Sequence, residues 1–456
     1  MQPTLHSWWQ AMEQEKTGCL QMPLYMLYTW CWTKPFGSGE WSLHLANLPW
    51  FVAGAAAFIL SFPAGDRRRL IAGCLVLLCP FAWYYLDEAR PYAMQLGAAL
   101  MAVASLRRMV QGCGAAERHG AGPLALFLSA LVVLCGSSLF GMIWAAAAGA
   151  ALVIALSGKQ LADMLRAHYR LLLAAAGPLV GLAVYYAWTL KAGARGSAAA
   201  TTTPGSILFV GYELLGFTGL GPGRLAMRSA GLTALQGYWV AVGLYAVAAA
   251  VLIGAAVWHG IKTWSPRRLA IALCCCVPPA CILGAGWLVH FRVLGRHLAP
   301  LVPAVLLLLI SGAAALWSRG SWWGRVAVAA FCLLSLLSCL SLRLAARHEK
   351  DNYRAAAAIA KAGLHNGQPV WWNAAEEGAL YYGVPVATRG ASQGEALFVA
   401  NPTRGWLRQL PSPALIVASK PDVYDGQGAL AEYIRERGYR EAGRLQAFII
   451  WEKSGN

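Results

Sequence analysis

The sequence has few charged residues, and this scarcity separates it from soluble proteins. Only 12% of its 456 residues are charged, whereas 58% are hydrophobic and the mean hydropathy is +0.50. A soluble globular protein carries about 25% charged residues. The composition therefore excludes the soluble globular class and predicts an integral membrane protein.

Other absences narrow the interpretation further. No Cys lies beyond Cys339, so a disulfide is excluded from the C-terminal segment. The run Cys274-Cys275-Cys276 falls inside an apolar stretch, where Cys behaves as a small hydrophobe, and a metal site is not expected there. The first twenty residues have no apolar core, so they do not resemble a cleavable signal peptide.

The positive charge is divided among short clusters. The formal net charge is +17, but the Lys and Arg residues lie between apolar segments and form no continuous basic stripe. This placement is typical of cations that flank membrane spans. We therefore expect a lipid bilayer as the partner of this surface, and no nucleic acid.

Ten segments are long and apolar enough to be predicted as membrane spans. A span needs about 20 apolar residues, because the hydrocarbon core is about 30 Å thick. The two predicted spans within 123–157 are the least clearly separated from each other. The predicted spans are 43–63, 70–86, 91–106, 123–138, 140–157, 171–190, 236–258, 269–289, 298–318 and 326–345.

Lys and Arg in the short loops predict the orientation. With the N-terminus outside, the inner loops 64–69, 107–121, 158–170, 259–268 and 319–325 hold 14 Lys or Arg in 51 residues. The outer segments 1–40, 86–91, 191–235 and 290–297 hold 9 in 99 residues. We expect a bacterial inner-membrane protein with residues 1–40 as an outer interfacial segment, 41–345 as the bundle, 191–235 as a long outer loop and 346–456 outside, in the periplasm.

Residues 346–456 differ in character from the bundle. They are more charged, and short buried strands are predicted at Pro369–Trp372, Ala396–Ala400, Ala414–Ala418 and Ala447–Trp451. Helices are predicted at Tyr353–Ala362 and Gly428–Arg437. The predicted fold class is thus mainly α, a polytopic transmembrane helical bundle with a small C-terminal extracytoplasmic α/β domain.

One outer turn combines several residues that are costly at the edge of the hydrocarbon. Asp87, Glu88 and Arg90 follow one span, and Pro91 and Tyr92 open the next. Charged residues at such a position are usually functional. The two carboxylates suit a hard divalent cation such as Mg²⁺ or Mn²⁺, and Arg90 suits a phosphate. The alternative is a helix cap with a local salt bridge.

Three other outer segments hold candidates. Glu13 and Glu15 lie in a Trp-rich stretch that also fits a plain interfacial anchor. Arg296 and His297 open a late span, where they would bind a lipid phosphate or simply snorkel. The turn Gly219–Arg224 would offer backbone N–H groups and Arg224 to an anion, or only connect two spans.

With these residues in view, the chain resembles the GT-C class of membrane glycosyltransferases, in particular the family 39-like group of protein O-mannosyltransferases and aminoarabinose transferases. The resemblance covers roughly residues 20–110 and is most specific at Glu88-Ala89-Arg90-Pro91-Tyr92. Other matching elements are Pro23-Leu24-Tyr25, Phe36–Glu40, Arg296–Pro300 and Asp351–Ala356.

The resemblance implies inverting transfer of a sugar from a polyprenyl-phosphate carrier to an acceptor outside the membrane. It implies that Asp87 or Glu88 helps to hold a divalent cation, and that Arg90, Arg296 and His297 stabilise the phosphate. We also predict that Tyr92 and Arg224 bind the phosphate. The family's catalytic base lies after a first span that this sequence lacks. A misplaced start codon is the favoured explanation, ahead of Glu13 or Glu15 as the base or an inactive protein.

Two other functional classes stay open. A lipid-linked oligosaccharide ligase or flippase would also bind prenyl phosphates with outer Arg residues, and a ligase would not need a metal. A non-catalytic scaffold would need none of the outer acids. Which sugar and which acceptor (lipid, glycan or protein) take part does not follow from the residues.

Overall fold

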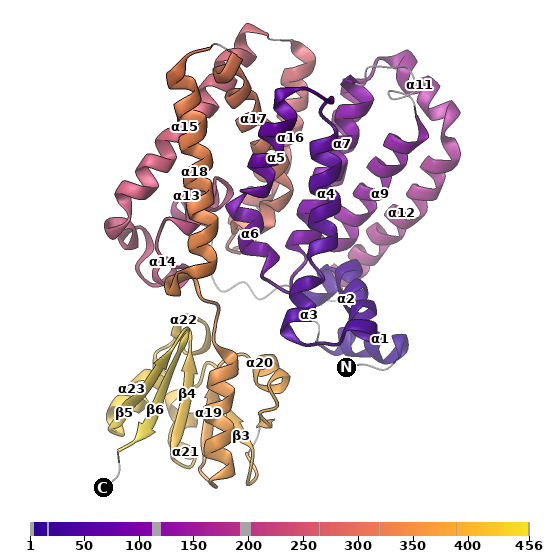
Figure 1. The fold of residues 1–456 in the computed structure, drawn as a ribbon. Coiled ribbons are helices and arrows are strands. Elements are labelled where there is room, and N and C mark those ends of the chain that lie inside the picture. The colour runs from indigo at the N-terminus through magenta and orange to yellow at the C-terminus, as the bar shows by residue number, and fades with distance from the viewer. Residues whose placement is uncertain are drawn as a thin grey trace. The chain divides into compact units, whose positions relative to one another are not determined.

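The structure, a computed structural model, describes residues 4–15, 18–111, 120–191, 202–263, 265–318, 320–388 and 390–454. It consists of two compact units, Met1–Leu344 and Ala345–Asn456 (Figure 1). The first unit is helical, and the second contains a six-stranded sheet. This confirms the predicted helical bundle with a small C-terminal α/β domain, and the extracytoplasmic location of that domain stays a prediction.

The first unit is an array of helices joined by short turns. Its shorter helices are η1 (Gly18–Gln21), η2 (Phe217–Gly219), α14 (Arg224–Ala230), η3 (Gly231–Gly237) and η4 (Gly295–Leu301). The others are α1 (Leu5–Glu15), α2 (Pro23–Phe36), α3 (Glu40–Leu45), α4 (Leu48–Leu60), α5 (Arg67–Leu77), α6 (Pro80–Leu86), α7 (Tyr92–Gln111), α9 (Ala121–Ser137), α10 (Gly141–Ala155), α11 (Gly158–Ala167), α12 (Tyr169–Lys191), α13 (Pro204–Leu214), α15 (Trp239–Lys262), α16 (Pro266–Leu288), α17 (Val302–Ser318) and α18 (Trp322–Leu344).

Every predicted span coincides with a helix, but fewer than ten qualify as spans by length and apolar composition. Among the described residues, six helical segments qualify alone, and up to eight if each bent pair counts as one span. The pairs are α5 with α6, bent by 43°, and α10 with α11, bent by 117°. The other two predicted spans correspond to α7, which contains Arg107 and Arg108 near its end, and α9, which has only 17 residues.

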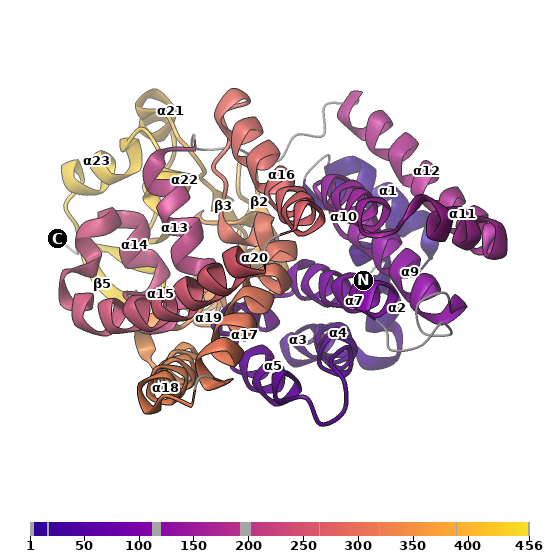
Figure 2. The ribbon, with the colours of Figure 1, turned by 90° about the horizontal axis from the view of Figure 1, so that it is seen from above.

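Close backbone contacts hold the helices together. Helix α4 packs on α7, α7 packs on α9, and α15 packs on α17 (Figure 2). At the first of these contacts, a Cβ on Gly54 would lie 2.6 Å from the Cα of Gly97. Small residues allow this approach, which is a common way for membrane helices to associate.

The two ends of the bundle have different chemistry. At the end that we call the basic end (residues 67–69, 107 and 108), Arg107 Nε donates to Ser61 Oγ at 3.3 Å. At the opposite end, the N-terminus of α4 contacts the turn after α6. The structure therefore separates the cations of two predicted inner loops from the acids of one predicted outer turn. Which side of the membrane each end faces stays a prediction.

The second unit is a mixed sheet with helices. Strand order is β2-β3-β1-β4-β6-β5, in which β1, β2, β3 and β4 pair in parallel and β6 runs antiparallel to β4 and β5. The strands are β1 (Val370–Asn373), β2 (Val386–Ala387), β3 (Ala396–Phe398), β4 (Leu415–Ser419), β5 (Tyr439–Leu445) and β6 (Phe448–Lys453). The helices are η5 (Ala346–His348), α19 (Tyr353–His365), α20 (Glu376–Tyr381), α21 (Arg404–Gln409), α22 (Pro421–Tyr424) and α23 (Ala429–Glu436).

The core of this unit lies on both faces of β1. Trp372 is fully buried on one face beside Phe448, and Trp371 is buried on the other face against Tyr433. Both tryptophans are therefore core residues, and the four predicted strands each overlap an observed strand.

Candidate functional site

The turn between α6 and α7 carries Asp87 and Glu88, and a side chain from α4's N-terminus holds it. Asn47 is 1% exposed, and its Nδ2 donates to the carbonyl oxygen of Leu86 at 3.1 Å and to that of Glu88 at 2.7 Å. Two hydrogen bonds from one buried amide fix both ends of a short backbone stretch. The backbone turn from which both carboxylates extend is therefore held in place.

Asp87 contacts one arginine and one histidine. Its Oδ2 lies 2.8 Å from Arg343 Nη1, at the end of α18, and its Oδ1 lies 3.3 Å from His44 Nδ1, at the end of α3. Arg343 also donates to the carbonyl oxygen of Trp83. Asp87 thus ties three helices together at this end of the bundle.

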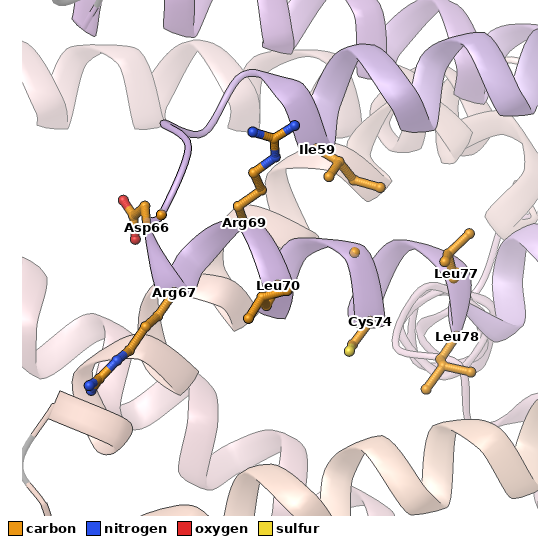
Figure 3. A pocket seen from close by; sticks show the side chains of 10 residues that line it. Ile59, Asp66, Arg67, Arg69, Leu70, Cys74, Leu77 and Leu78 are labelled. Atoms are coloured by element: carbon orange, nitrogen blue, oxygen red, sulfur yellow. The ribbon is translucent and has the colours of Figure 1, made fainter.

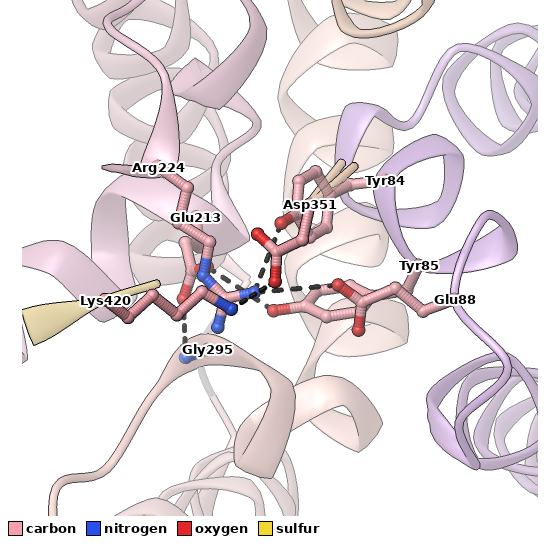
Figure 4. A network of polar contacts seen from close by, with 8 residues as sticks. All are labelled: Tyr84, Tyr85, Glu88, Glu213, Arg224, Gly295, Asp351 and Lys420. Atoms are coloured by element: carbon pink, nitrogen blue, oxygen red, sulfur yellow. Dashed lines mark hydrogen bonds and ion pairs between the residues drawn. The ribbon is translucent and has the colours of Figure 1, made fainter. Parts of the chain in front are cut away.

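Glu88 takes a different partner. Its Oε1 lies 3.6 Å from Arg224 Nη1, and the same nitrogen donates to Tyr84 Oη at 3.2 Å (Figure 4). The Glu88 side chain is 15% exposed and that of Arg224 is 36% exposed. The ion pair is longer than that of Asp87 with Arg343, and the Arg224 side chain is partly exposed.

Glu213 lies behind this pair and is 5% exposed. Its Oε2 accepts from the backbone N–H of Gly295 at 2.7 Å, and its Oε1 accepts from Tyr85 Oη at 3.4 Å (Figure 4). Burial raises the pKa of Glu213, while Arg224 and the Gly295 N–H act in the opposite direction. The carboxylate joins α13, α6 and the start of η4.

The backbone at Gly295 is matched to Glu213. A Cβ on Gly295 would lie 2.7 Å from Glu213 Oε2 and 2.9 Å from its Cβ, so any larger residue would displace the carboxylate. Glycine is the residue that permits such an approach of backbone to a side chain.

Arg224 is surrounded by groups that keep it cationic. Burial would lower its pKa, but Tyr84, Tyr85, Glu88 and Glu213 raise it above the ordinary arginine value. An anion that reaches the guanidinium of Arg224 therefore meets a full positive charge.

Arg296 and His297 follow Gly295 and have different environments. Arg296 Nε is buried, and it has no hydrogen-bond partner within the described part of the chain. Its Cζ lies 5.7 Å from the centre of the Tyr92 ring. His297 Nδ1 accepts from the Leu294 N–H at 3.1 Å, which gives this histidine a structural role in the turn.

Tyr25 and Arg90 complete the neighbourhood. Tyr25 is 2% exposed, and its hydroxyl has no hydrogen-bond partner among the described residues. Burial raises the pKa of Tyr25, and the charge of Arg90 opposes that shift. Arg90 itself is exposed, and its N–H donates to the Glu88 carbonyl oxygen at 2.7 Å. Its guanidinium therefore remains accessible to solvent.

The remaining candidates are not joined to this cluster. Glu13 is exposed on α1. On the same helix, Trp9 stacks on Trp188 of α12, with the ring centres 6.2 Å apart. The side chain of Glu15 lies outside the described residues, as do residues 192–201 of the predicted outer loop. In the Gly219–Arg224 turn, Gly221 donates its N–H to the Phe217 carbonyl oxygen, so this amide serves the turn itself.

The carboxylates do not fit the divalent-cation site that the sequence predicts. Asp87 and Glu88 pair with different cations, Arg343 and Arg224, instead of converging on one point. No group of three or more His, Cys, Asp or Glu side chains with metal-binding geometry occurs in the described ranges. We therefore derive no chemical step through a metal, and the metal stays a prediction.

The sequence interpretation missed the residues that organise this site. Asn47 and Arg343 carried no signal in an apolar sequence, whereas Tyr25 belongs to the Pro23-Leu24-Tyr25 element of the resemblance. Glu213 gave one signal, because it is the only acid in the predicted outer loop 191–235. A lone acid amid apolar residues such as Phe209 and Phe217 is costly unless it has a specific partner.

No protein-family model and no curated protein sequence matches the chain. Among solved structures, the chain is similar to ArnT from Cupriavidus metallidurans bound to undecaprenyl phosphate. The similarity covers 95% of this chain and 88% of the other, with 13% sequence identity and a TM-score of 0.47.

Proposed function

We propose that this chain is a glycosyltransferase that moves a sugar from a polyprenyl-phosphate carrier to an acceptor at the outer, periplasmic face of a bacterial inner membrane. The observation that carries the proposal is the cluster of Arg224, Glu88 and Glu213 at one end of an apolar helical bundle. An accessible guanidinium at the end of membrane helices suits a ligand with an anionic head and an apolar tail.

Two cations are proposed to receive the phosphate. Arg224 is held only loosely by Glu88, at 3.6 Å, so a phosphate competes well for its guanidinium. Arg296 Nε has no hydrogen-bond partner among the described residues, and the guanidinium lies over the Tyr92 ring. Arg90 adds an exposed third charge. Guanidinium groups bind phosphate oxygens through paired, charge-assisted hydrogen bonds.

The proposed reaction needs charge stabilisation and one base. The acceptor oxygen attacks the anomeric carbon as the bond from that carbon to the phosphate oxygen breaks, and negative charge develops on the phosphate. Arg224 and Arg296 would stabilise this charge. Glu88 is proposed to accept the acceptor's proton, because it lies beside Arg224 and its contact with that arginine is longer than the contact of Asp87 with Arg343. Asp87 is less suited, since both of its oxygens have partners. Glu13 and Glu15 stay as alternative bases.

A binding and transfer assay with the full chain tests the proposal. Arg224→Ala should weaken binding of a polyprenyl phosphate by about 10- to 150-fold, since hydrogen bonds to a charged group contribute about 1.5–3 kcal/mol. Arg228→Ala, one turn later on α14 and exposed, is the matched control. Glu88→Gln should reduce transfer with little loss of binding, and Arg90→Ala should weaken binding. Unchanged binding and transfer in all the site variants would refute the assignment.

Two added arms test the other expectations. Transfer that survives EDTA would exclude the predicted divalent cation. Normal cellular function after Asp87, Glu88 and Glu213 are all neutralised would favour a scaffold.

A further inference from the structure

A groove lies at the basic end of the bundle, at the opposite end from Glu88. It has a volume of about 710 Å³ and is formed by the last turn of α4, the connecting turn and one face of α5. Figure 3 shows Asp66, Arg67 and Arg69 at the start of α5, with the side chains of Arg67 and Arg69 pointing to opposite sides of the helix, followed along the helix by Leu70, Cys74, Leu77 and Leu78.

The wall of this groove is apolar and faces outward. Leu70 is 76% exposed and Leu77 is 55% exposed, and Cys74 between them is exposed as well. Gly73 leaves the groove open, because a Cβ there would meet no atom within 4 Å. Exposed leucines along a spanning helix are suited to contact with fatty acyl chains.

The groove is also about as deep as one leaflet. From Arg67 to Leu77 the helix rises roughly 15 Å, at 1.5 Å per residue. That is half of the roughly 30 Å hydrocarbon core. A phospholipid whose head lies beside the first turn of α5 would therefore reach the membrane centre with its tail still in the groove.

The mouth of the groove has uncompensated positive charge. The one acid there, Asp66, is taken by Arg68, with Oδ2 2.7 Å from Nη2. Arg107 is held by Ser61 and lies over the Phe62 ring. By contrast, Arg67 and Arg69 make no hydrogen bond or ion pair through their side chains in the described part of the chain, although both line the groove.

We propose that this groove is a binding site for an anionic phospholipid, with its phosphate at Arg67 and one acyl chain along Leu70, Cys74 and Leu77. Arg69 adds positive charge from the other side of α5. Basic residues beside a span attract anionic lipids electrostatically. The apolar wall supplies a second contact, with the acyl chain, and a soluble phosphate has no acyl chain to make it. The inference is independent of the proposed glycosyl transfer.

Cys74 gives a direct measurement of occupancy. The purified full chain in neutral detergent is alkylated with a maleimide, and the modification of each Cys is followed by peptide mass spectrometry. Cys276 and Cys281, exposed on α16, report general coverage by lipid in the same sample. Half-protection of Cys74 should need roughly 30-fold less phosphatidylglycerol than phosphatidylcholine with the same acyl chains, given two arginines at the membrane surface beside the groove. Cys276 and Cys281 should show no preference.

Variants separate the two halves of the site. The double variant Arg67→Gln/Arg69→Gln should abolish the preference, whereas Lys159→Gln/Arg166→Gln on α11, an exposed pair of cations away from the groove, should retain it. Gly73→Leu fills the groove and should reduce the selective protection although both arginines remain.

Three results would overturn the proposal. They are equal protection of Cys74 by both phospholipids, protection by glycerol phosphate without acyl chains, and protection by a polyprenyl phosphate without any by phosphatidylglycerol. The last result would assign the groove to the tail of a prenyl carrier.

Discussion

Replacing Asn47 by Ala removes the side chain that holds the turn carrying Asp87 and Glu88. The change deletes two hydrogen bonds from Nδ2, at 3.1 and 2.7 Å, to the carbonyl oxygens of Leu86 and Glu88. Each buried hydrogen bond contributes about 1 kcal/mol net, and a carbonyl left dry and unpaired costs up to about 3 kcal/mol. We therefore expect a loss of at least about 2 kcal/mol from the free energy of local opening.

Hydrogen exchange of the turn measures this loss directly. The N–H groups of Glu88 and Arg90 are hydrogen-bonded within the turn, so they exchange only when it opens. A loss of about 2 kcal/mol should speed their exchange by roughly 30-fold, since each 1.4 kcal/mol is a factor of ten. Glycosyl transfer should fall in parallel, because Glu88 is no longer held in position.

The control is Asn352→Ala, which removes the N-cap of α19 in the second unit. It should cost about 1 kcal/mol there and leave exchange at residues 86–91 unchanged. If Asn47→Ala folds normally and exchange of the turn stays within twofold of the parent, the positioning role of Asn47 is wrong.

Three further predictions concern other parts of the chain. Because burial raises the folded pKa of Glu213, its contribution to stability is present below the ordinary Glu pKa and is lost as the pH rises through the raised value. Unfolding titrations over that window should slope downward relative to Glu213→Gln, and parallel curves would contradict this. Gly295→Ala should cost about 1–3 kcal/mol of unfolding free energy by pushing against Glu213, whereas Gly243→Ala on open α15 should not destabilise the chain. Asp425→Ala removes the acceptor for two N–H groups of α23 at 2.9 Å, and exchange of that helix should report a loss of about 0.5–2 kcal/mol, with no change expected in α19.

The outer acids serve different purposes in the structure. Asp87 is committed to Arg343 and His44, and it joins helix ends. Glu88 has a longer contact with Arg224, at 3.6 Å, and is the proposed base. Neutralising Asp87 should therefore affect stability more than chemistry, and neutralising Glu88 the reverse.

The sequence by itself determined the class of protein and most of its elements. Low charge and long apolar runs predict membrane-spanning helices. A helix pairs its backbone N–H and C=O groups within one segment, which the hydrocarbon core requires because it contains no water. Central strands were equally clear: β1 and β4 are continuous apolar runs buried on both faces. The strands it missed, β2 and β5, are a two-residue strand and a largely exposed edge strand, and neither carries a hydrophobic pattern.

Tertiary structure alone decided which charges meet. Asp87 and Glu88 are neighbours in sequence, yet one pairs with Arg343 from the last helix of the bundle and the other with Arg224 from the long loop. Glu213 finds its main partner in a backbone N–H 82 residues away. Such pairings depend on how helices pack, and packing follows from the shapes of many side chains together. A local sequence pattern reports which face of a helix is apolar, but it does not report which helix lies beside it.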